Sequence, residues 1–313
     1  MNRRGFTLIE LLIVTLIGLF VLQAAYLLYS GSFKLFQDVK TQADNVQTKI
    51  PTIELIGRYF DRWGVNVLES GADCSSYPPV NAKCITKAAQ TGLPSGITCD
   101  QVAFWGNIYG FGVVQSVAGT PAVANLVSCR LQYTSSTAGT KHNCYYLWRN
   151  NQLQNQTVSG FLAILQLNSN LNPTNADCAG LASGTTSNAT VSATLTPTAA
   201  AQMFGAVDKT MAAGDILQRA PHQIRLYCGA NAWDGGRNWL YVDLTDTSLA
   251  CGTDESAVPI APVNAFQVEL LPSGCAAASG GCSAVSVSVT FRSQSEKSSG
   301  VYATQTAQRV YGR

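Results

Sequence analysis

Residues 3–22 read RRGFTLIELLIVTLIGLFVL, an apolar run that follows two arginines and contains one carboxylate, Glu10. A charged side chain at the centre of a membrane helix costs about 2.5–3.5 kcal/mol on insertion scales, and less near an end of the helix. One interpretation places Glu10 at the headgroup boundary, where its carboxylate reaches water. The other gives Glu10 a function inside the membrane, which requires a cationic partner.

The N-terminal segment differs from a secretory signal, whose apolar core of roughly 7–15 residues precedes a small-residue cleavage site. Here the chain carries no charge from Leu11 to Tyr29, and no such cleavage site follows. About 20 residues span the hydrocarbon core of a bilayer, so residues 6–29 are predicted to remain as a membrane helix. Arg3 and Arg4 predict a cytoplasmic N-terminus, and the rest of the chain then faces outward.

A second apolar pattern predicts that the helix continues beyond the membrane as an amphipathic segment, residues 30–63. Apolar residues recur there at steps of three and four and form a heptad seam: Phe36, Val39, Ala43, Val46, Ile50, Ile53, Gly57 and Phe60. We expect its second half to pack on the chain's own globular domain, whereas the membrane half has no domain beside it. Pro51 removes a backbone hydrogen bond, so the helix is predicted to be interrupted there, with a kink near Ile50.

Composition indicates a folded chain that is polar but poor in charge. Charged residues make up 12% of the 313 residues, and the formal net charge is +2. Arg3 and Arg4 account for that surplus, and no basic patch interleaved with aromatic residues is present. The sequence therefore predicts no nucleic-acid partner.

The ten cysteines favour disulfides in an oxidising compartment over a metal or redox site. No C-x-x-C spacing occurs, and the chain has only two histidines. An even number of cysteines in an outward-facing chain is typical of a disulfide framework. The candidates are Cys74, Cys84, Cys99, Cys129, Cys144, Cys178, Cys228, Cys251, Cys275 and Cys282. Spacing suggests Cys129–Cys144 and Cys275–Cys282 as local pairs, and the remaining connectivity stays open.

After Gly64 the periodicity changes to short runs rich in Val, Tyr, Phe and Trp, punctuated by Gly, Asn, Pro and Ser. Such runs predict strands, here at residues 101–114, 125–136, 143–150, 160–168, 223–229, 238–245, 265–272 and 284–294. The predicted fold class is therefore α+β, with a long N-terminal helix packed on an antiparallel β-sheet domain whose loops are pinned by disulfides. Residues 181–202 are predicted to form an exposed loop.

The leader, the apolar run and the long helix together resemble a type IV prepilin. The matching stretch is RRGFTLIELLIV, residues 3–14, with a basic leader, a glycine, an aromatic residue and a glutamate. The stretch LIGRYFDRWGVNV, residues 55–67, is similar to the end of the N-terminal helix in PilW-type minor pilins. The resemblance covers roughly the first 67 residues. One departure is that no proline precedes Pro51, whereas major pilins usually carry one in the membrane half of the helix.

The resemblance implies a role for three residues at the start of the chain. A membrane peptidase would cut after Gly5, and the new N-terminal residue, Phe6, would be N-methylated. Glu10 would then neutralise the Phe6 amine of a neighbouring subunit in the filament core. Such a pair is strong in a low-dielectric setting, and either member is costly when left unpaired.

No catalytic constellation is visible in the outward domain, which lacks a Walker A loop, G-x-G-x-x-G, H-E-x-x-H and G-x-S-x-G. The sequence therefore predicts no enzyme activity, no catalytic residue and no cofactor. Asp243, Asp246, Asp254 and Glu255 could bind calcium, but they lack EF-hand spacing and fit a solvated loop face better. The stretch WDGGRNW, residues 233–239, fits either a binding loop or a turn with two core tryptophans.

These observations lead us to expect a leader at 1–5, a transmembrane and filament-core helix at 6–29, its amphipathic continuation at 30–63 and a β-rich globular domain at 64–313. The resemblance implies a minor pilin that helps to prime a type IV pilus near its tip. Its expected partners are other pilins and minor pilins, the prepilin peptidase, the inner-membrane assembly platform and inner-membrane lipid. The expected location is the bacterial inner membrane, single-pass with the N-terminus inside, and then the periplasm and the cell-surface pilus. The alternatives are a minor pseudopilin of type II secretion and a membrane-tethered adhesin or binding protein that does not polymerise.

Overall fold

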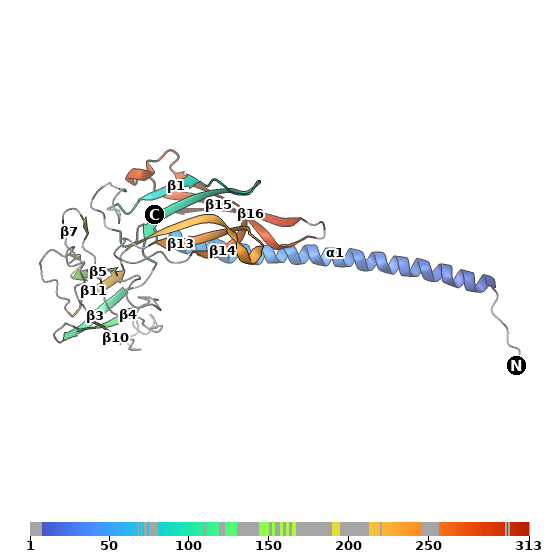
Figure 1. Ribbon diagram of the computed structural model, residues 1–313, viewed down its shortest axis with the longest axis horizontal. Coiled ribbons are helices and arrows are strands. Elements are labelled where there is room, and N and C mark those ends of the chain that lie inside the picture. The colour runs from blue at the N-terminus through green and yellow to red at the C-terminus, as the bar shows by residue number, and fades with distance from the viewer. Residues whose placement is uncertain are drawn as a thin grey trace.

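The protein is a long helix joined to a β-rich domain (Figure 1). The computed structural model describes residues 8–67, 69, 71, 74, 81–108, 111–118, 123–129, 144–149, 152–153, 157–158, 161–162, 165–166, 190–194, 213–219, 221–245, 257–297, 299 and 301–312. The first half of the helix projects away from the domain, and the second half lies along it. The predicted class, a long helix packed on an antiparallel-rich sheet with disulfides, is confirmed.

Helix α1 spans Leu8–Phe60, 53 residues in one continuous element. It runs through Pro51, so the predicted interruption at this residue is wrong, while the kink near Ile50 stays a prediction. Proline has no backbone N–H, so the helical hydrogen bond to the Gln47 carbonyl is missing. Pro51 lies on the exposed side of the helix. Asn45 and Thr52, on either side of the proline, are both buried against the sheet. These contacts hold both segments of the helix along the same domain surface.

The main sheet has seven strands in the order β1-β2-β12-β13-β14-β15-β16. Their bounds are Ile85–Ala89, Thr98–Gly106, His222–Asn231, Arg237–Thr245, Val258–Leu271, Ala284–Glu296 and Tyr302–Gly312. Neighbours along this order pair antiparallel, and β2 also pairs with β14 in parallel through Thr98 and Cys99. Helix α1 packs against β15 and β16, which lie more than 200 residues after it in the sequence.

The alternation of buried and partly exposed side chains along β15 shows which face of the sheet packs into the core. Val285, Val287, Val289 and Phe291 have no exposed surface, while Ser288 and Thr290 between them are partly exposed. Successive side chains of a strand point to opposite faces, so the apolar set packs inward. The same core contains Phe104, Ile224, Leu226, Leu240 and Phe266.

A second sheet lies at the end of the domain opposite the free half of α1 (Figure 1). Its strand order is β10-β4-β3-β11-β5-β6, with bounds Thr190–Thr194, Val123–Cys129, Phe111–Ala118, Ile216–Arg219, Cys144–Arg149 and Gln152–Leu153. Strand β9, Leu165–Gln166, also pairs with β5, and β7, Thr157–Val158, pairs with β8, Phe161–Leu162. Strand β10 falls inside residues 181–202, so the prediction of an unstructured loop is wrong for those five residues.

Three disulfides connect described cysteines: Cys74–Cys84, Cys99–Cys228 and Cys275–Cys282. The second joins β2 to β12 across 129 residues of chain. The third closes the connection between β14 and β15 that contains the 3-10 helix η4, Ala277–Ser279, and is the local pair that spacing suggested. The side chains of Cys129, Cys144, Cys178 and Cys251 lie outside the described residues, so their pairing stays a prediction.

Candidate assembly site on the N-terminal helix

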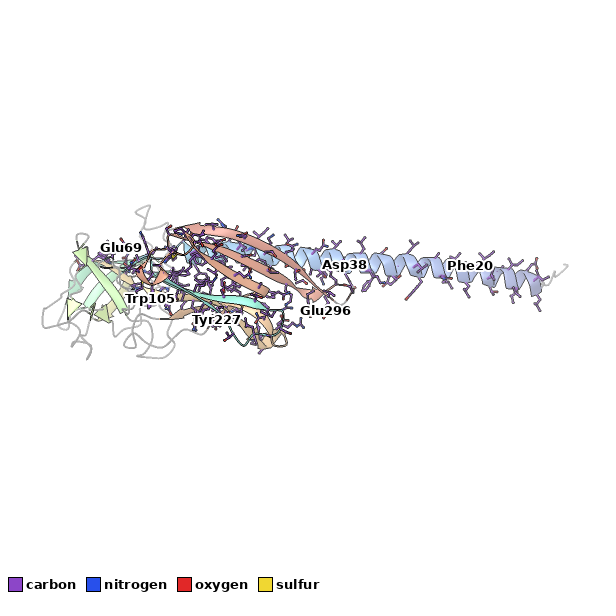
Figure 2. All side chains as sticks on the ribbon, turned by 90° about the horizontal axis from the view of Figure 1, so that it is seen from above. Phe20, Asp38, Glu69, Trp105, Tyr227 and Glu296 are labelled. Atoms are coloured by element: carbon purple, nitrogen blue, oxygen red, sulfur yellow. A yellow bond between two sulfur atoms is a disulfide. The ribbon has the colours of Figure 1, made fainter. Side chains whose placement is uncertain are left out.

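The first half of α1 is apolar and uncovered by the rest of the described chain. Its most apolar window has a mean hydropathy of 2.5 and no buried residue, which makes α1 long and apolar enough to cross a membrane. Residues 8–29 measure about 33 Å at 1.5 Å per residue, close to the roughly 30 Å of a hydrocarbon core. Phe20, labelled on this half in Figure 2, is 61% exposed. An apolar surface of this size needs lipid or other chains around it.

Glu10 lies in the first turn of α1 as the structure describes it, and its side chain points to the helix exterior. It is the one charged residue in residues 8–29. A carboxylate in the first turn interacts favourably with the helix macrodipole, which offsets part of the cost of placing it in an apolar run. Gly5 and Phe6 lie outside the described residues, so cleavage and methylation there stay predictions.

The second half of α1 docks on β15 and β16 through a polar stripe. Thr41, Asn45 and Thr52 are 1%, 0% and 4% exposed. Asn45 Nδ2 donates to the Ala303 carbonyl at 3.2 Å, and Thr41 Oγ1 lies 3.4 Å from the Glu296 carbonyl. Figure 2 shows Glu296 beside the turn of α1 that carries Asp38, where the domain begins. Small polar residues thus bring this part of the helix close to the strand backbone.

The first half of the predicted seam is not the docking surface, which agrees with the expectation that only its second half packs on the domain. Ile50, at the start of the second half, is the exception. Phe36, Val39, Val46 and Ile50 are 65%, 56%, 42% and 57% exposed, and Ala43 is exposed as well. At about 100° per residue they lie roughly opposite Thr41 and Asn45 on the helix. We call these five residues the exposed stripe. Within the described chain no sheet residue covers them, because the sheet occupies the other face of α1.

The C-terminal end of α1 is held by aromatic packing, as the second half of the seam predicted. Phe60 is 2% exposed and stacks on Phe104 and Tyr311, with ring centroids 4.8 and 4.9 Å apart. Tyr311 Oη donates to the Ile53 carbonyl at 3.1 Å. A Cβ on Gly57 would meet the Tyr311 ring at 3.2 Å, so the glycine allows this close approach.

The chain after α1 is fixed to the same sheet. Trp63 is 3% exposed, and its Nε1 donates to the Cys84 carbonyl at 3.3 Å. It forms a β-bridge with Gly106, where a Cβ would overlap the Arg62 carbonyl. The last turn of the helix therefore cannot lift from the sheet without breaking this bridge.

The stretch WDGGRNW forms the turn between β12 and β13, around the 3-10 helix η2, Ala232–Asp234. Asn231 Oδ1 accepts a hydrogen bond from the Trp233 backbone N–H at 2.9 Å, and Gly235 and Gly236 take φ of 61° and 77°. The Trp233 side chain is 97% exposed, so the alternative with two core tryptophans is wrong for this residue.

A charge cluster fixes the inner side of this turn. Asp234 Oδ2 accepts hydrogen bonds from Trp239 Nε1 at 2.9 Å and Arg292 Nη2 at 2.7 Å, and Arg237 lies 3.4 Å from Asp234 Oδ1. Burial opposes ionisation of Asp234, but these hydrogen bonds and the charges of Arg292 and Arg237 outweigh it. They hold the pKa of Asp234 below its usual value of 3.8. Nothing in the sequence signals that Arg292, 58 residues later, meets Asp234.

Of the four calcium candidates the structure describes only Asp243. Asp243 is 4% exposed and forms an ion pair with Arg225. Asp246, Asp254 and Glu255 lie outside the described residues. Among the residues that the structure describes, no group of three or more His, Cys, Asp and Glu side chains could hold a metal ion.

The N-terminal segment matches a known family. Residues 1–26 match the family model described as the prokaryotic N-terminal methylation motif. This match supports a type IV prepilin-like protein. It contains the positions of Gly5, Phe6 and Glu10 and ends inside the free half of α1. The motif and the uncovered apolar helix together indicate membrane anchoring.

A relative without an assigned role matches most of the chain. The chain is 29% identical over 295 residues to an uncharacterized protein of Aquifex aeolicus (strain VF5), and the match covers 92% of each chain. No solved structure matches this chain. The likeness therefore extends through the β-rich domain, but it carries no function with it.

Proposed function

We propose that this protein is a minor pilin of the PilW type, a non-enzymatic subunit that helps to prime a type IV pilus near its tip. One observation carries the proposal: the methylation motif over residues 1–26 leads directly into a helix whose first half is apolar and uncovered. Such a surface suits packing against the equivalent helices of other subunits. The firm docking of residues 52–63 on the sheet would carry the globular domain along with the helix.

In this proposal the chain first spans the inner membrane once, with Arg3 and Arg4 in the cytoplasm. The prepilin peptidase then cuts after Gly5, and Phe6 becomes the N-methylated first residue. Inner-membrane lipid surrounds the free half of α1 until the assembly platform transfers the subunit into the filament. The domain faces the periplasm before assembly and the cell surface afterwards, where the disulfides persist.

Glu10 is the residue on which the assembly step depends. The Phe6 amine created by cleavage carries a positive charge among apolar helices, and the Glu10 carboxylate of a neighbour would neutralise it. Removing one partner of such a buried pair costs about 3–5 kcal/mol, because the other charge remains uncompensated. The pair would thus set the axial stagger between adjacent subunits.

The test compares Glu10→Val with the parent chain in cells that make pili. Glu10→Val should be inserted and cut normally, since neither step needs this charge, but it should be depleted from sheared filaments. Glu10→Asp keeps the charge with a shorter reach and should be incorporated in part. The measurement is the ratio of mature subunit in sheared filaments to that in the inner membrane. Normal incorporation of Glu10→Val would contradict the charge pair.

The same preparation separates the two other candidates. N-terminal sequencing should find Phe6 first in a filament subunit, whereas a tethered adhesin that does not polymerise could retain Met1. Recovery with the secretion pseudopilus, and not with sheared pili, would assign the chain to type II secretion.

A further inference from the structure

Trp233 is the most exposed large apolar side chain outside α1 among the described residues, at 97%. The turn that carries it is held by the Asn231 cap and by the bonds of Asp234 to Trp239 and Arg292. An aromatic side chain on such a fixed turn loses little conformational entropy when it binds, and tryptophan is enriched among residues that dominate binding interfaces. These features suit Trp233 to bind a partner, and we call this residue the anchor.

The contacts around the turn show at which level along α1 this anchor lies. The Arg292 guanidinium that bonds to Asp234 stacks over the Tyr302 ring at 4.9 Å, and Tyr302 pairs with Glu296 in the sheet. The Glu296 carbonyl lies 3.4 Å from Thr41 Oγ1. These contacts lead from the turn to the part of α1 that carries the exposed stripe, Phe36 to Ile50.

Strand β12, which leads to the anchor, and the exposed stripe lie on different sides of the molecule. Figure 2 places Tyr227 of β12, the strand that leads to the turn, on the side of the domain away from α1. The exposed stripe lies on the face of α1 that is turned away from the sheet. One chain cannot bring these two surfaces together, but two parallel chains lying side by side can.

The level of the turn disfavours lipid as the partner. Thr41 lies 12 residues beyond Tyr29, about 18 Å along the helix. The headgroup region on one side of a bilayer is roughly 5–8 Å thick. If residues 8–29 fill the hydrocarbon core, Trp233 stands clear of the headgroups.

We infer that Trp233 packs on the exposed stripe of a second copy of this chain, in a front-to-back contact between two parallel, membrane-anchored copies. This inference rests on the subunit role proposed above. Insertion of both copies in the same direction keeps the helices parallel, and the stripe, about 21 Å long, tolerates an axial offset between them. Front-to-back contacts use a different surface on each partner, so they can repeat along a growing assembly.

The contact is small, and the membrane must assist it. A buried tryptophan contributes about 150–250 Å², far less than the roughly 800 Å² that each partner buries in a stable interface. Anchoring both chains in one membrane raises their effective concentration and orients them. The contact is therefore expected in the membrane-bound full chain.

Photo-crosslinking in cells tests this contact with the full chain. A benzoylphenylalanine replaces Trp233, and two differently tagged copies are made together. The expected result is a crosslink between the two tags, which mass spectrometry maps to residues 33–54 of the other copy. The same photoreactive residue at Val258, which is 57% exposed and away from the turn, is the control and should not reach the stripe.

A second pair of variants tests the stripe itself. Val46→Asp places a charge on the stripe and should lower the crosslinked fraction at least fivefold. Lys40→Asp places the same side chain on an exposed position beside the stripe and should change it less than twofold. Crosslinks to lipid or to a different protein alone, no crosslink at all, or an equal yield from Val258 would overturn the inference. So would an unchanged yield with Val46→Asp.

Failure of this inference can be told apart from failure of the proposed function. If Trp233→Ala enters sheared filaments at the parental level and position 233 gives no crosslink between copies, the contact is wrong and the subunit role stands. If Glu10→Val enters filaments normally, the charge pair of the proposed function is wrong whatever position 233 reports.

Discussion

Replacing Phe60 with alanine tests most directly whether the second half of the seam on α1 packs on the domain while the first half does not. Phe60 is 2% exposed and stacks on Phe104 and Tyr311 at 4.8 and 4.9 Å. Phe→Ala changes in a core cost about 3–5 kcal/mol, and the two ring contacts place this site toward the upper part of that range. In domains of 150–250 residues each kcal/mol lowers Tm by roughly 2–4 °C, so we expect a loss of about 8–16 °C.

Phe36→Ala is the matched control, because it is the same change on the same helix. Phe36 is 65% exposed and belongs to the exposed stripe, so its removal should change stability by no more than about 0.5 kcal/mol. A large shift for Phe36→Ala would mean that the stripe packs on its own domain.

The assay is thermal unfolding of the full chain in detergent micelles. Trp63 and Trp105, 3% and 6% exposed, report loss of the core through their fluorescence. The apolar half of α1 stays in the micelle, so the transition reports the sheet domain and its docked helix. Equal shifts for Phe36→Ala and Phe60→Ala would refute the assignment of opposite faces to the two residues.

Four further expectations follow from single features. Gly57→Val should lower the Tm of the domain, because the new side chain would crowd the Tyr311 ring. Gly31→Val has open space around it and should leave that Tm unchanged, and circular dichroism melts compare the two variants. The ionised form of Asp234 stabilises the fold above about pH 4, and this contribution is lost as the pH falls through the lowered pKa of the folded state. The free energy of unfolding, measured by denaturant titration, should therefore fall less at acid pH for Asp234→Asn than for the parent chain. Alkylation of the unfolded, unreduced chain should label none of the ten cysteines, and several labelled thiols would contradict a full disulfide set. Gly5→Val precursor should accumulate uncut, and intact mass would show this directly.

The long helix and the strand-rich domain could be predicted because their signals are local. A mostly apolar run without charge from Leu11 to Leu22 suffices for a membrane helix, and alternation of apolar and polar residues in β15 suffices for a half-buried strand. Strand β16 escaped prediction because Thr, Gln and Ala fill most of it, and only Ala303 and Tyr311 are buried. Its place is decided by pairing with β15.

The docking face of α1 could be predicted only in part from hydrophobic periodicity. The second half of the seam contains the buried Gly57 and Phe60, but nothing in the pattern indicated that Thr41 and Asn45 are buried. These side chains are short, and they allow close approach where larger apolar residues would not fit. Asn45 bonds to a strand carbonyl, and Thr41, which bonds to the Gln37 carbonyl of its own helix, lies 3.4 Å from the Glu296 carbonyl. Such a choice depends on the partner strand, which lies more than 250 residues away in the chain. For Trp233 the sequence left a binding loop and a core position both open, and only the structure shows that this residue is exposed.

The great sequence distance between α1 and its docking strands has a consequence for synthesis. Thr41, Asn45 and Ile53 bond to residues that come 255, 258 and 258 positions later. The helix is made before β16, so the membrane-spanning half of α1 can enter the membrane while the docking face is still uncovered. Contacts of such long range form slowly and only once β16 has been made. A product that stops before β16 lacks Tyr311 against Phe60 and is expected to expose an apolar face to proteases. Stable docking of α1 is therefore expected only in molecules in which β16 has been made.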